Sequence, residues 1–262
     1  MFKFGLIGEK LGHSLSPEIH GNIFRETSFD ADYQLYEIKR ENLCNIKEFM
    51  RDNSLSGINV TIPYKQEILP FLDEISPEAE KIGAVNTVFR SGDSLIGFNT
   101  DYFGFGEMLR YHGISFQNKT VLVLGNGGAA KAVVAYLSDN GAKKVYIVSR
   151  NSATDPRVIS YDELRGLNDY VIVNTTPVGM YPNVNACAVS DDIIEKSCAV
   201  TDLIYNPKDT LLIQKAKQYS KPCCSGMYML VAQAVKAQEI WRNIKVSYEI
   251  INKVFEIQNE DN

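Results

Sequence analysis

Residues 120–130 read Thr-Val-Leu-Val-Leu-Gly-Asn-Gly-Gly-Ala-Ala, and this stretch decides the fold of the second half of the chain. Its first five residues are apolar or β-branched, as is typical of a buried strand. Glycines follow at 125, 127 and 128, and a helix-forming segment continues from there to Leu137. A strand that passes through a glycine-rich turn into a helix begins a βαβ unit, in which helices connect parallel strands.

The glycine-rich turn is also the first chemical signal. Without Cβ atoms, the backbone amides of such a turn can approach a pyrophosphate at the positive N-terminal end of the following helix. The third glycine position is taken by Ala130, which the motif accepts. The turn therefore predicts a dinucleotide-binding site, and a tight turn without a ligand is the structural alternative.

Short apolar runs alternate with helical patterns along the whole chain, which predicts the α/β class with mainly parallel sheets. We expect two α/β domains: residues 1–100, completed by the C-terminal helices at 227–262, and a nucleotide-binding domain at 101–226. The expected strands of the first domain are Lys3–Gly8, Asp32–Ile38, Gly57–Ile62, Ala84–Phe89 and Leu95–Phe98. Those of the second are Thr120–Leu124, Lys144–Val148, Tyr170–Asn174 and Ala199–Tyr205.

The residues after the second strand of the nucleotide-binding domain indicate which dinucleotide binds. An NAD site places an acid there for the ribose hydroxyls, whereas this chain has Ser149-Arg150-Asn151. A guanidinium suits a 2′-phosphate through charge-assisted hydrogen bonds, so NADP is favoured over NAD. A solvated surface arginine is the alternative reading.

Two serines, Ser14 and Ser16, lie two residues apart in the sequence His13-Ser14-Leu15-Ser16-Pro17. Pro17 favours an extended backbone at Ser16, and in an extended chain residues two apart point to the same side. Ser14 and Ser16 can then present two hydroxyls to a small carboxylate. Serines before a proline are otherwise often helix caps.

Polar residues also occupy the strands and strand ends of the first domain. Asn59 and Thr61 are expected on the same face of the strand Gly57–Ile62. Lys65 is expected in the first turn of the helix that follows this strand. Asn86 lies in an apolar run, where a ligand or neighbouring backbone must satisfy its amide. Asp101 opens the next helix as a functional carboxylate or as a plain cap.

The first of the C-terminal helices carries an apolar stripe at helical spacing, formed by Leu230, Ala234, Ala237 and Trp241. Gln233 lies on the same side, so its amide points toward the interior or a cleft. Ligand contact and a satisfied structural amide are equally compatible with this position.

Bulk properties limit the partners. The formal net charge of -5 argues against nucleic-acid or anionic-membrane binding, and no apolar run is long enough to span a membrane. The chain starts without a secretory signal, so we expect a cytoplasmic protein. Its five cysteines lack C-x-x-C spacing and are expected as reduced, mostly buried thiols, and its three histidines are widely spaced, so no metal is expected.

These motifs together resemble the shikimate dehydrogenase family over nearly the whole chain. Eight matches occur in the family's order: His-Ser-Leu-Ser-Pro at 13–17, Asn-Val-Thr-Ile-Pro-Tyr-Lys at 59–65, Gly-Ala-Val-Asn-Thr at 83–87, Gly-Phe-Asn-Thr-Asp at 97–101, Gly-Asn-Gly-Gly-Ala-Ala at 125–130, Asn-Thr-Thr-Pro-Val-Gly-Met at 174–180, Asp-Leu-Ile-Tyr-Asn-Pro at 202–207 and Met-Leu-Val-Ala-Gln-Ala at 229–234. One match could arise by chance, but eight in order could not.

The resemblance implies an NADP-dependent dehydrogenase that reduces 3-dehydroshikimate to shikimate, with its active site in a cleft between a substrate domain and a Rossmann-type domain. It makes Lys65 and Asp101 the catalytic pair. It implies that the substrate is bound by Ser14, Ser16, Thr61, Asn86, Tyr205 and Gln233. It implies that NADP is bound by Gly125, Asn126, Gly127, Gly128, Ala129, Ser149, Arg150, Asn151, Leu203 and Gly226.

Two alternatives to a strict shikimate dehydrogenase stay open. An enzyme of mixed quinate and shikimate specificity must accept one more ring hydroxyl, and Ser16 favours shikimate because relatives that take quinate often have threonine there. A non-catalytic paralogue could bind the same ligands as a sensor, although it would be free to lose Lys65 and Asp101.

The family often has another arginine three or four residues after Arg150, whereas this chain has one only at Arg157, so NADP preference could be weaker. The sequence leaves open whether the chain forms a homodimer.

Overall fold

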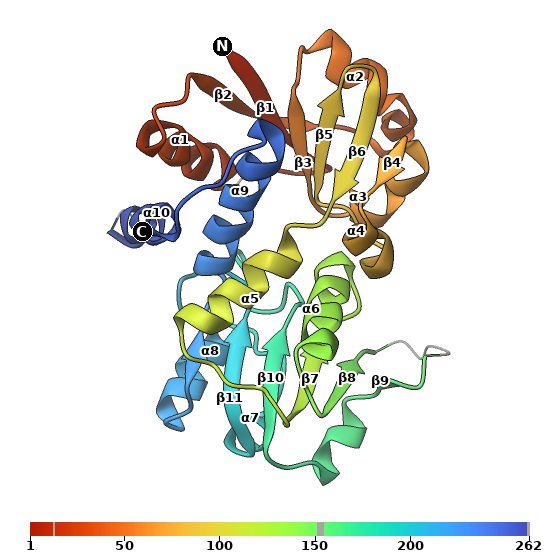
Figure 1. Cartoon of the computed structure of the whole chain (residues 1–262). Coiled ribbons are helices and arrows are strands. Elements are labelled where there is room, and N and C mark those ends of the chain that lie inside the picture. Colours follow the sequence, from red (N-terminus) through yellow and green to blue (C-terminus); the bar gives the residue numbers. More distant parts are fainter. Residues whose placement is uncertain (13, 151–154, 261–262) are drawn as a thin grey trace. The chain divides into compact units, whose positions relative to one another are not determined.

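The computed structural model describes residues 1–12, 14–150 and 155–260. The chain folds into two compact units, each with its own sheet (Figure 1). The first comprises Met1–Phe103 and Val231–Asn262, and the second comprises Gly104–Leu230. The first unit is therefore built from both ends of the chain, while the second is one continuous segment.

The first unit contains a six-stranded sheet with the order β2-β1-β3-β5-β6-β4. Strand β1 is parallel to β2 and β3, and β4 is parallel to β6, whereas β5 is antiparallel to both of its neighbours. The strands are β1 (Phe2–Gly8), β2 (Ala31–Glu37), β3 (Gly57–Val60), β4 (Glu74–Ile75), β5 (Thr87–Ser91) and β6 (Ser94–Phe98). The helical segments are α1 (Ser16–Glu26), η1 (Arg40–Asn45), α2 (Ile46–Asp52), α3 (Tyr64–Glu67), η2 (Leu69–Phe71), α4 (Pro77–Ile82) and α10 (Tyr248–Glu260).

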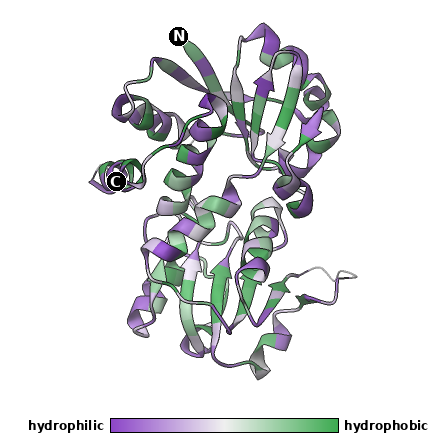
Figure 2. Cartoon of the chain, in the orientation of Figure 1, coloured by the Kyte–Doolittle hydropathy of each residue, from purple (hydrophilic) through white to green (hydrophobic). Residues whose placement is uncertain are grey.

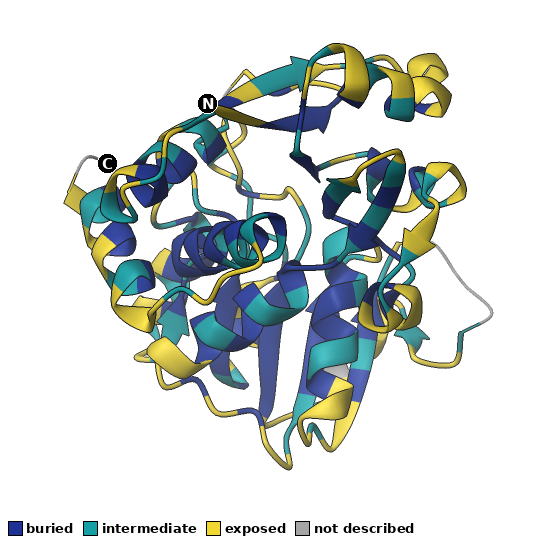
Figure 3. Cartoon of the chain, turned by 45° about the horizontal axis from the view of Figure 1, so that its top comes forward, coloured by how far each residue is buried: buried dark blue, intermediate teal, exposed yellow. Residues whose placement is uncertain are grey.

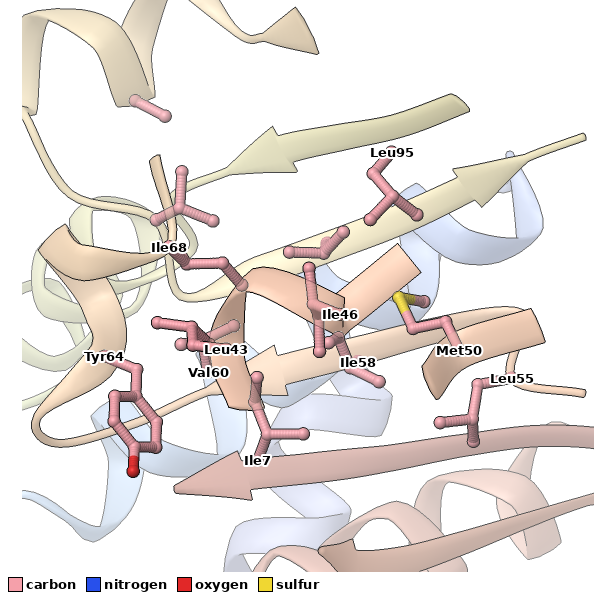
Figure 4. Close-up of a cluster of buried hydrophobic side chains, with 13 residues drawn as sticks. Ile7, Leu43, Ile46, Met50, Leu55, Ile58, Val60, Tyr64, Ile68 and Leu95 are labelled. Atoms are coloured by element: carbon pink, nitrogen blue, oxygen red, sulfur yellow. The ribbon is translucent and has the colours of Figure 1, made fainter. Parts of the chain in front are cut away.

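The alternation of side chains along β1 explains why this sheet has helices on both faces. Ile7 points into a cluster formed with η1, α2 and α3, which includes Ile46, Met50 and Tyr64 (Figure 4). Phe4 and its neighbour two residues on, Leu6, belong to a different cluster on the opposite face. A strand that is buried on both faces needs apolar residues at consecutive positions, and β1 supplies them.

The second unit contains six parallel strands in the order β12-β11-β10-β7-β8-β9. Its strands are β7 (Thr120–Leu124), β8 (Lys144–Val148), β9 (Val158–Ile159), β10 (Tyr170–Asn174), β11 (Ser197–Asp202) and β12 (Cys223–Cys224). Its helical segments are α6 (Gly128–Asp139), η3 (Asp162–Gly166), α7 (Asp191–Glu195) and α8 (Leu211–Gln218). Helices α5 (Asp101–Tyr111) and α9 (Met227–Arg242) each contain a boundary between the two units.

The central strands of the second unit are mostly apolar, as Figure 2 shows for β7 and β10. Every residue of β10 is buried, and so are four of the five in β7 (Figure 3). Parallel strands covered on both faces lose the polar alternation of a half-exposed strand. The α/β class and the two units with mainly parallel sheets are thus confirmed.

Some expected boundaries were wrong. The strand expected at Ala84–Phe89 begins only at Thr87, and the one expected at Gly57–Ile62 ends at Val60. Strands β4, β9 and β12 were not expected at all, because a two-residue strand has too few residues to show periodicity. Among the helices of the described residues, none combines the length and the apolar character needed to cross a membrane.

Candidate functional site

Lys65 and Asp101 form a shielded ion pair in the first unit. Lys65 is the second residue of α3, which follows β3, and Asp101 is the first residue of α5, which follows β6. The Lys65 Nζ lies 2.6 Å from Asp101 Oδ2, and the two side chains are only 15% and 7% exposed. A carboxylate thus fixes an ammonium group in partly dehydrated surroundings, where its interaction with a developing negative charge is stronger than in water.

Asn86 connects this pair to the backbone. It lies directly before β5 rather than inside a strand, and it is buried. Its Nδ2 donates to Asp101 Oδ1 at 2.9 Å and to Thr100 Oγ1 at 3.0 Å, and its Oδ1 accepts from the Thr100 amide at 2.7 Å. The neighbouring chain therefore satisfies this amide, and Asp101 uses its carboxylate for Lys65 and Asn86.

Gln233 reaches the same cluster from α9. Its Oε1 accepts a hydrogen bond from Thr100 Oγ1 at 3.2 Å. The side chain is half-buried and lies four residues before buried Ala237. The expectation that Gln233 lies on the inward side of this helix is confirmed, and the structure brings together Lys65, Asn86, Asp101 and Gln233.

Ser14 and Ser16 also meet, although the backbone expected for Ser16 was wrong. Ser16 is not extended but begins α1, after Leu15 in a helical conformation with φ of -80° and ψ of -1°. Proline is well accommodated in the first helical turn, so Pro17 continues the helix. Ser14 Oγ lies 3.1 Å from Ser16 Oγ, and the Ser16 amide donates to Ser14 Oγ at 3.3 Å. The tight turn at Leu15, rather than an extended chain, places the two hydroxyls together.

Thr61 and Tyr205 belong to different units of the chain. Thr61 is half-buried, one residue past the end of β3, and its amide donates to the Ile7 carbonyl at 3.0 Å. Tyr205 belongs to the second unit, three residues after β11, and burial raises the pKa of its hydroxyl.

The glycine-rich turn has the geometry that its sequence predicts. Gly125 has a φ of +101°, which favours glycine, and a Cβ there would lie 2.9 Å from Thr175 Oγ1. Gly127 is the N-cap of α6, and no side chain caps the first-turn amides. Asn126 and Gly127 are exposed, whereas Gly128 and Ala129 are half-buried. An uncapped helix N-terminus behind glycines fits the pyrophosphate of a dinucleotide.

Leu203 and Gly226 lie directly against each other. A Cβ on Gly226 would be 2.1 Å from the Leu203 carbonyl oxygen, and the Gly226 amide donates to the Ile204 carbonyl at 3.0 Å. Only glycine allows this approach of two backbones at the end of β11. Two residues assigned to the NADP site by resemblance, 23 positions apart in the numbering, are therefore neighbours.

The end of β8 carries the residues expected to select NADP. Ser149 is half-buried and its amide donates to the Ile159 carbonyl at 3.0 Å, whereas Arg150 is exposed. Burial raises the pKa of the Tyr161 hydroxyl, and the nearby charge of Arg150 partly opposes this rise. Asn151 lies outside the described residues. Arg157 is paired with Asp155 through several hydrogen bonds, which lower the pKa of Asp155 to about 2. Arg150 is thus the described arginine here without a carboxylate partner at hydrogen-bonding distance.

Sequence reasoning missed the residues that hold the site in place. The Thr100 amide and the Thr87 hydroxyl both donate to the Asn86 side-chain oxygen, and Tyr33 donates to Asn59 Oδ1 at 2.8 Å. Thr100 stands directly before Asp101, a position that could have drawn attention to it. Tyr33 gave no signal, because an aromatic residue in a half-buried strand is an ordinary core residue.

Comparisons with known proteins point to one family. The model of the shikimate dehydrogenase substrate binding domain matches residues 6–88. The shikimate dehydrogenase (NADP(+)) of Clostridium beijerinckii is 45% identical, with 98% of each chain covered. The crystal structure of shikimate dehydrogenase 1 from Peptoclostridium difficile is 41% identical and has a TM-score of 0.94, covering 100% of this chain and 99% of that one. A Thermus thermophilus shikimate 5-dehydrogenase in complex with NADP(H) and shikimate is 30% identical, with a TM-score of 0.86 and coverage of 98% and 99%.

Proposed function

The chain belongs to the shikimate dehydrogenase family, and from this premise we propose that it catalyses the reversible NADPH-dependent reduction of 3-dehydroshikimate to shikimate, a step toward the aromatic amino acids. The observation that carries the proposal is the shielded Lys65–Asp101 pair, with Asn86 and Gln233 beside it. A sensor would be free to lose this pair, so its retention favours an enzyme.

Lys65 and Asp101 are the proposed catalytic residues. Reduction of a ketone puts negative charge on its oxygen, and the Lys65 ammonium can donate a hydrogen bond and then a proton to that oxygen. Asp101 holds the ammonium at 2.6 Å and so limits its orientation. Asn86 in turn fixes the carboxylate, which keeps the donor in place before substrate binds.

The remaining polar residues are proposed to recognise the substrate. Ser14 and Ser16, which already contact each other, would donate their hydroxyls to the carboxylate together with Tyr205. Asn86, Gln233 and Thr61 would bind the ring hydroxyls. Relatives that accept quinate often have threonine at the position of Ser16. We therefore propose that shikimate is a better substrate than quinate.

NADP fits the second unit, which we propose as the cofactor-binding part, with the first unit binding the substrate. The uncapped start of α6 and the glycines before it suit the pyrophosphate, and Arg150 suits the 2′-phosphate. Glycine at position 226 lets the backbone lie directly against Leu203 at the end of β11. When bound, NADPH supplies the hydride. Asn126, Ala129, Ser149 and Asn151 complete the proposed cofactor site.

We propose the cytoplasm as the location of the enzyme. All five cysteines are unpaired, which suits a reducing compartment. The expectation that most are buried was wrong: Cys44 is exposed, Cys224 is buried, and the other three lie between these extremes. We propose a homodimer as the assembly, and size-exclusion chromatography coupled to light scattering would test it.

The test is the formation of reduced nicotinamide, followed by absorbance, when the purified protein receives shikimate with NADP. NAD replaces NADP in a second assay, and quinate replaces shikimate in a third. We expect the highest kcat/KM with shikimate and NADP. Turnover mainly with NAD would contradict the role of Arg150, and binding of both ligands without turnover would support a sensor instead.

A further inference from the structure

Thr87 is a buried hydroxyl at the centre of the hydrogen bonds around Asn86. It is the first residue of β5, lies opposite Asn59 of β3 and has no exposed surface. Its Oγ1 accepts from Asn59 Nδ2 at 3.0 Å, donates to Asn86 Oδ1 at 3.1 Å and lies 3.2 Å from Thr100 Oγ1. Because Thr87 is fully buried, any effect that it has on a ligand must pass through these neighbours.

Backbone groups fix the orientation of the two asparagine amides in this cluster. Asn59 Nδ2 lies 3.2 Å from the Asn86 carbonyl, which can only accept, so Asn59 turns its nitrogen toward Thr87. The Thr100 backbone amide, which can only donate, lies 2.7 Å from Asn86 Oδ1. Asn86 therefore turns its nitrogen toward Thr100 Oγ1, at 3.0 Å, and toward Asp101. Each threonine hydroxyl thus accepts one N–H and has one proton to donate.

The two hydroxyl protons can be assigned from the acceptors that surround them. Thr87 donates to Asn86 Oδ1, which at 3.1 Å is closer than Thr100 Oγ1 at 3.2 Å. Thr100 Oγ1 lies 3.2 Å from both Asn86 Oδ1 and Gln233 Oε1. An amide oxygen has two acceptor sites, and on Asn86 the Thr100 amide and the Thr87 hydroxyl fill both. The proton of the Thr100 hydroxyl therefore goes to Gln233.

This assignment determines which end of the Gln233 amide faces Thr100. With its oxygen bound to the Thr100 hydroxyl, Gln233 turns its nitrogen, which can only donate, to the opposite side. Without the Thr87 hydroxyl, Thr100 can give its proton to Asn86 Oδ1 and then offers Gln233 only an acceptor. Gln233 would then turn its nitrogen toward Thr100 and its oxygen to the opposite side. The exchange replaces a donor with an acceptor at nearly the same position.

We propose that Thr87 is a positioning residue for substrate recognition: its hydroxyl occupies Asn86 Oδ1 and so directs the Thr100 proton to Gln233, which presents N–H donors to a ring oxygen of the substrate. This inference rests on the proposed function, in which Gln233 binds the ring hydroxyls. It adds a residue that contacts no substrate and that decides whether Gln233 donates or accepts.

The test is Thr87→Val, which removes the hydroxyl and keeps the β-branched shape. Asn59 Nδ2 keeps the Asn86 carbonyl, and Asn86 Oδ1 keeps the Thr100 amide, so no buried group loses its last partner. We expect the KM for shikimate to rise about fivefold, because one hydrogen bond to the substrate is lost. The kcat should stay within about twofold and the KM for NADP should not change, because the catalytic ion pair keeps its contacts.

Two controls separate the hydroxyl from the rest of the side chain. Thr87→Ser keeps the hydroxyl and should have a KM for shikimate within about twofold of wild type. Thr201→Val is the matched control: Thr201 is a buried threonine of β11 in the second unit, and its Oγ1 donates to the Ile172 carbonyl at 3.4 Å. It should leave the KM for shikimate unchanged. A KM in Thr87→Ser as high as that in Thr87→Val would overturn the proposal.

A double-mutant cycle tests whether Thr87 acts through Gln233. Gln233→Leu removes the amide, so adding Thr87→Val to it should change the KM for shikimate by less than about twofold. A fivefold effect that persists without the Gln233 amide would overturn the proposal. An unchanged KM in Thr87→Val, in a protein that turns over shikimate, would overturn this role and leave the proposed function intact. Absence of wild-type turnover would overturn both.

A second variant keeps the test decisive if Thr87→Val is unstable. Thr100→Val removes the hydroxyl that links Asn86 to Gln233, while Asn86 Nδ2 keeps its bond to Asp101. Its KM for shikimate should rise as much as that of Thr87→Val, and the two changes together should add little to either one. A wild-type KM in Thr100→Val would overturn the proposal, because the proposed path to Gln233 runs through this hydroxyl.

Discussion

At the residue scale, the shielded ion pair makes a direct prediction for Lys65. Lys65→Ala removes the proposed proton donor, and general acid catalysis contributes about 10²- to 10⁴-fold, so we expect kcat to fall within that range. The KM should change much less, because the recognition residues remain. Steady-state kinetics would check both values.

The control for this variant is Lys47→Ala. Lys47 forms an exposed ion pair with Asp73 at 2.9 Å in the same unit, and surface pairs contribute little. Activity should stay within about twofold of wild type. A wild-type kcat in Lys65→Ala would remove Lys65 from the chemistry.

The buried hydrogen bonds of Asn86 predict a loss of stability when this side chain is removed. Asn86→Ala leaves the Thr100 amide without its 2.7 Å acceptor and Asp101 without one donor, in a buried place. We expect the free energy of unfolding to fall by about 2 kcal/mol, since an unsatisfied buried group costs about 1 to 3 kcal/mol. Urea unfolding would measure this. Asn53→Ala, which removes a half-buried bond to the Phe49 carbonyl, should cost clearly less, and equal losses would contradict the argument.

The sequence shows residue types but not hydrogen-bond partners, and this limited the prediction of the site. Lys65, Asp101 and Gln233 lie at helix positions that spacing can assign, and their expected places in those helices were confirmed. Tyr33 is 26 positions from its partner Asn59, and only the pairing of β1 with both β2 and β3 brings the strands together. Such contacts depend on sheet order, which local periodicity does not encode.

At the element scale, the approach of Gly226 to Leu203 predicts an effect on the cofactor site. In Gly226→Ala the new Cβ would meet the Leu203 carbonyl at 2.1 Å, so the start of α9 must move away from the end of β11. We expect a lower melting temperature and a higher KM for NADP. Differential scanning fluorimetry and kinetics would test these outcomes.

Gly21→Ala serves as the control for the same change of residue. Gly21 lies within α1, and a Cβ there has no heavy atom within 4 Å. Alanine is a better helix former than glycine by about 1 kcal/mol, so the melting temperature should rise or stay the same. A Gly226→Ala protein that matches this control would show that the contact is easily relieved.

The elements themselves were predictable to different degrees. The strand, turn and helix at residues 120–139 follow from the glycines and the apolar run, and the structure has β7 and α6 there. The start of α1 was not predicted correctly, because Pro17 restricts Ser16 in general but is also acceptable within a first helical turn. One rule for Pro17 favours an extended backbone at Ser16 and the other permits a helix. The sequence alone does not show which of the two applies, because the surrounding fold decides it.

At the scale of the whole molecule, one buried carboxylate links folding to pH. Asp202 accepts hydrogen bonds from Thr210, Asn174 and the Ile204 amide, yet burial dominates and raises its pKa from 3.8 to about 6. The folded state therefore binds the proton more tightly than the unfolded state. The buried charge of Asp202 lowers the free energy of unfolding. This loss is absent below pH 3.8, grows as the pH rises to about 6 and then stays constant.

We expect Asp202→Asn to remove this loss. The change in pKa corresponds to about 3 kcal/mol, so the variant should gain stability relative to wild type between about pH 4 and pH 7 by up to that amount. Urea unfolding at both pH values would measure the gain. Asp191→Asn, at an exposed position of the same unit, should show no comparable dependence. An equal difference between variant and wild type at both pH values would contradict the role of Asp202.

The division of the chain into units has a consequence for its synthesis. Residues 104–230 form a continuous unit that can fold once they have left the ribosome. The first unit cannot complete its fold before α9 has been made, because Trp241 of α9 is part of its core. The Trp241 ring stacks on Phe4 with ring centroids 4.7 Å apart, and its Nε1 donates to the Val88 carbonyl at 2.9 Å. The residues made first must therefore wait for the residues made last. During translation the N-terminal strands therefore expose apolar side chains, such as Phe4, until α9 has been made.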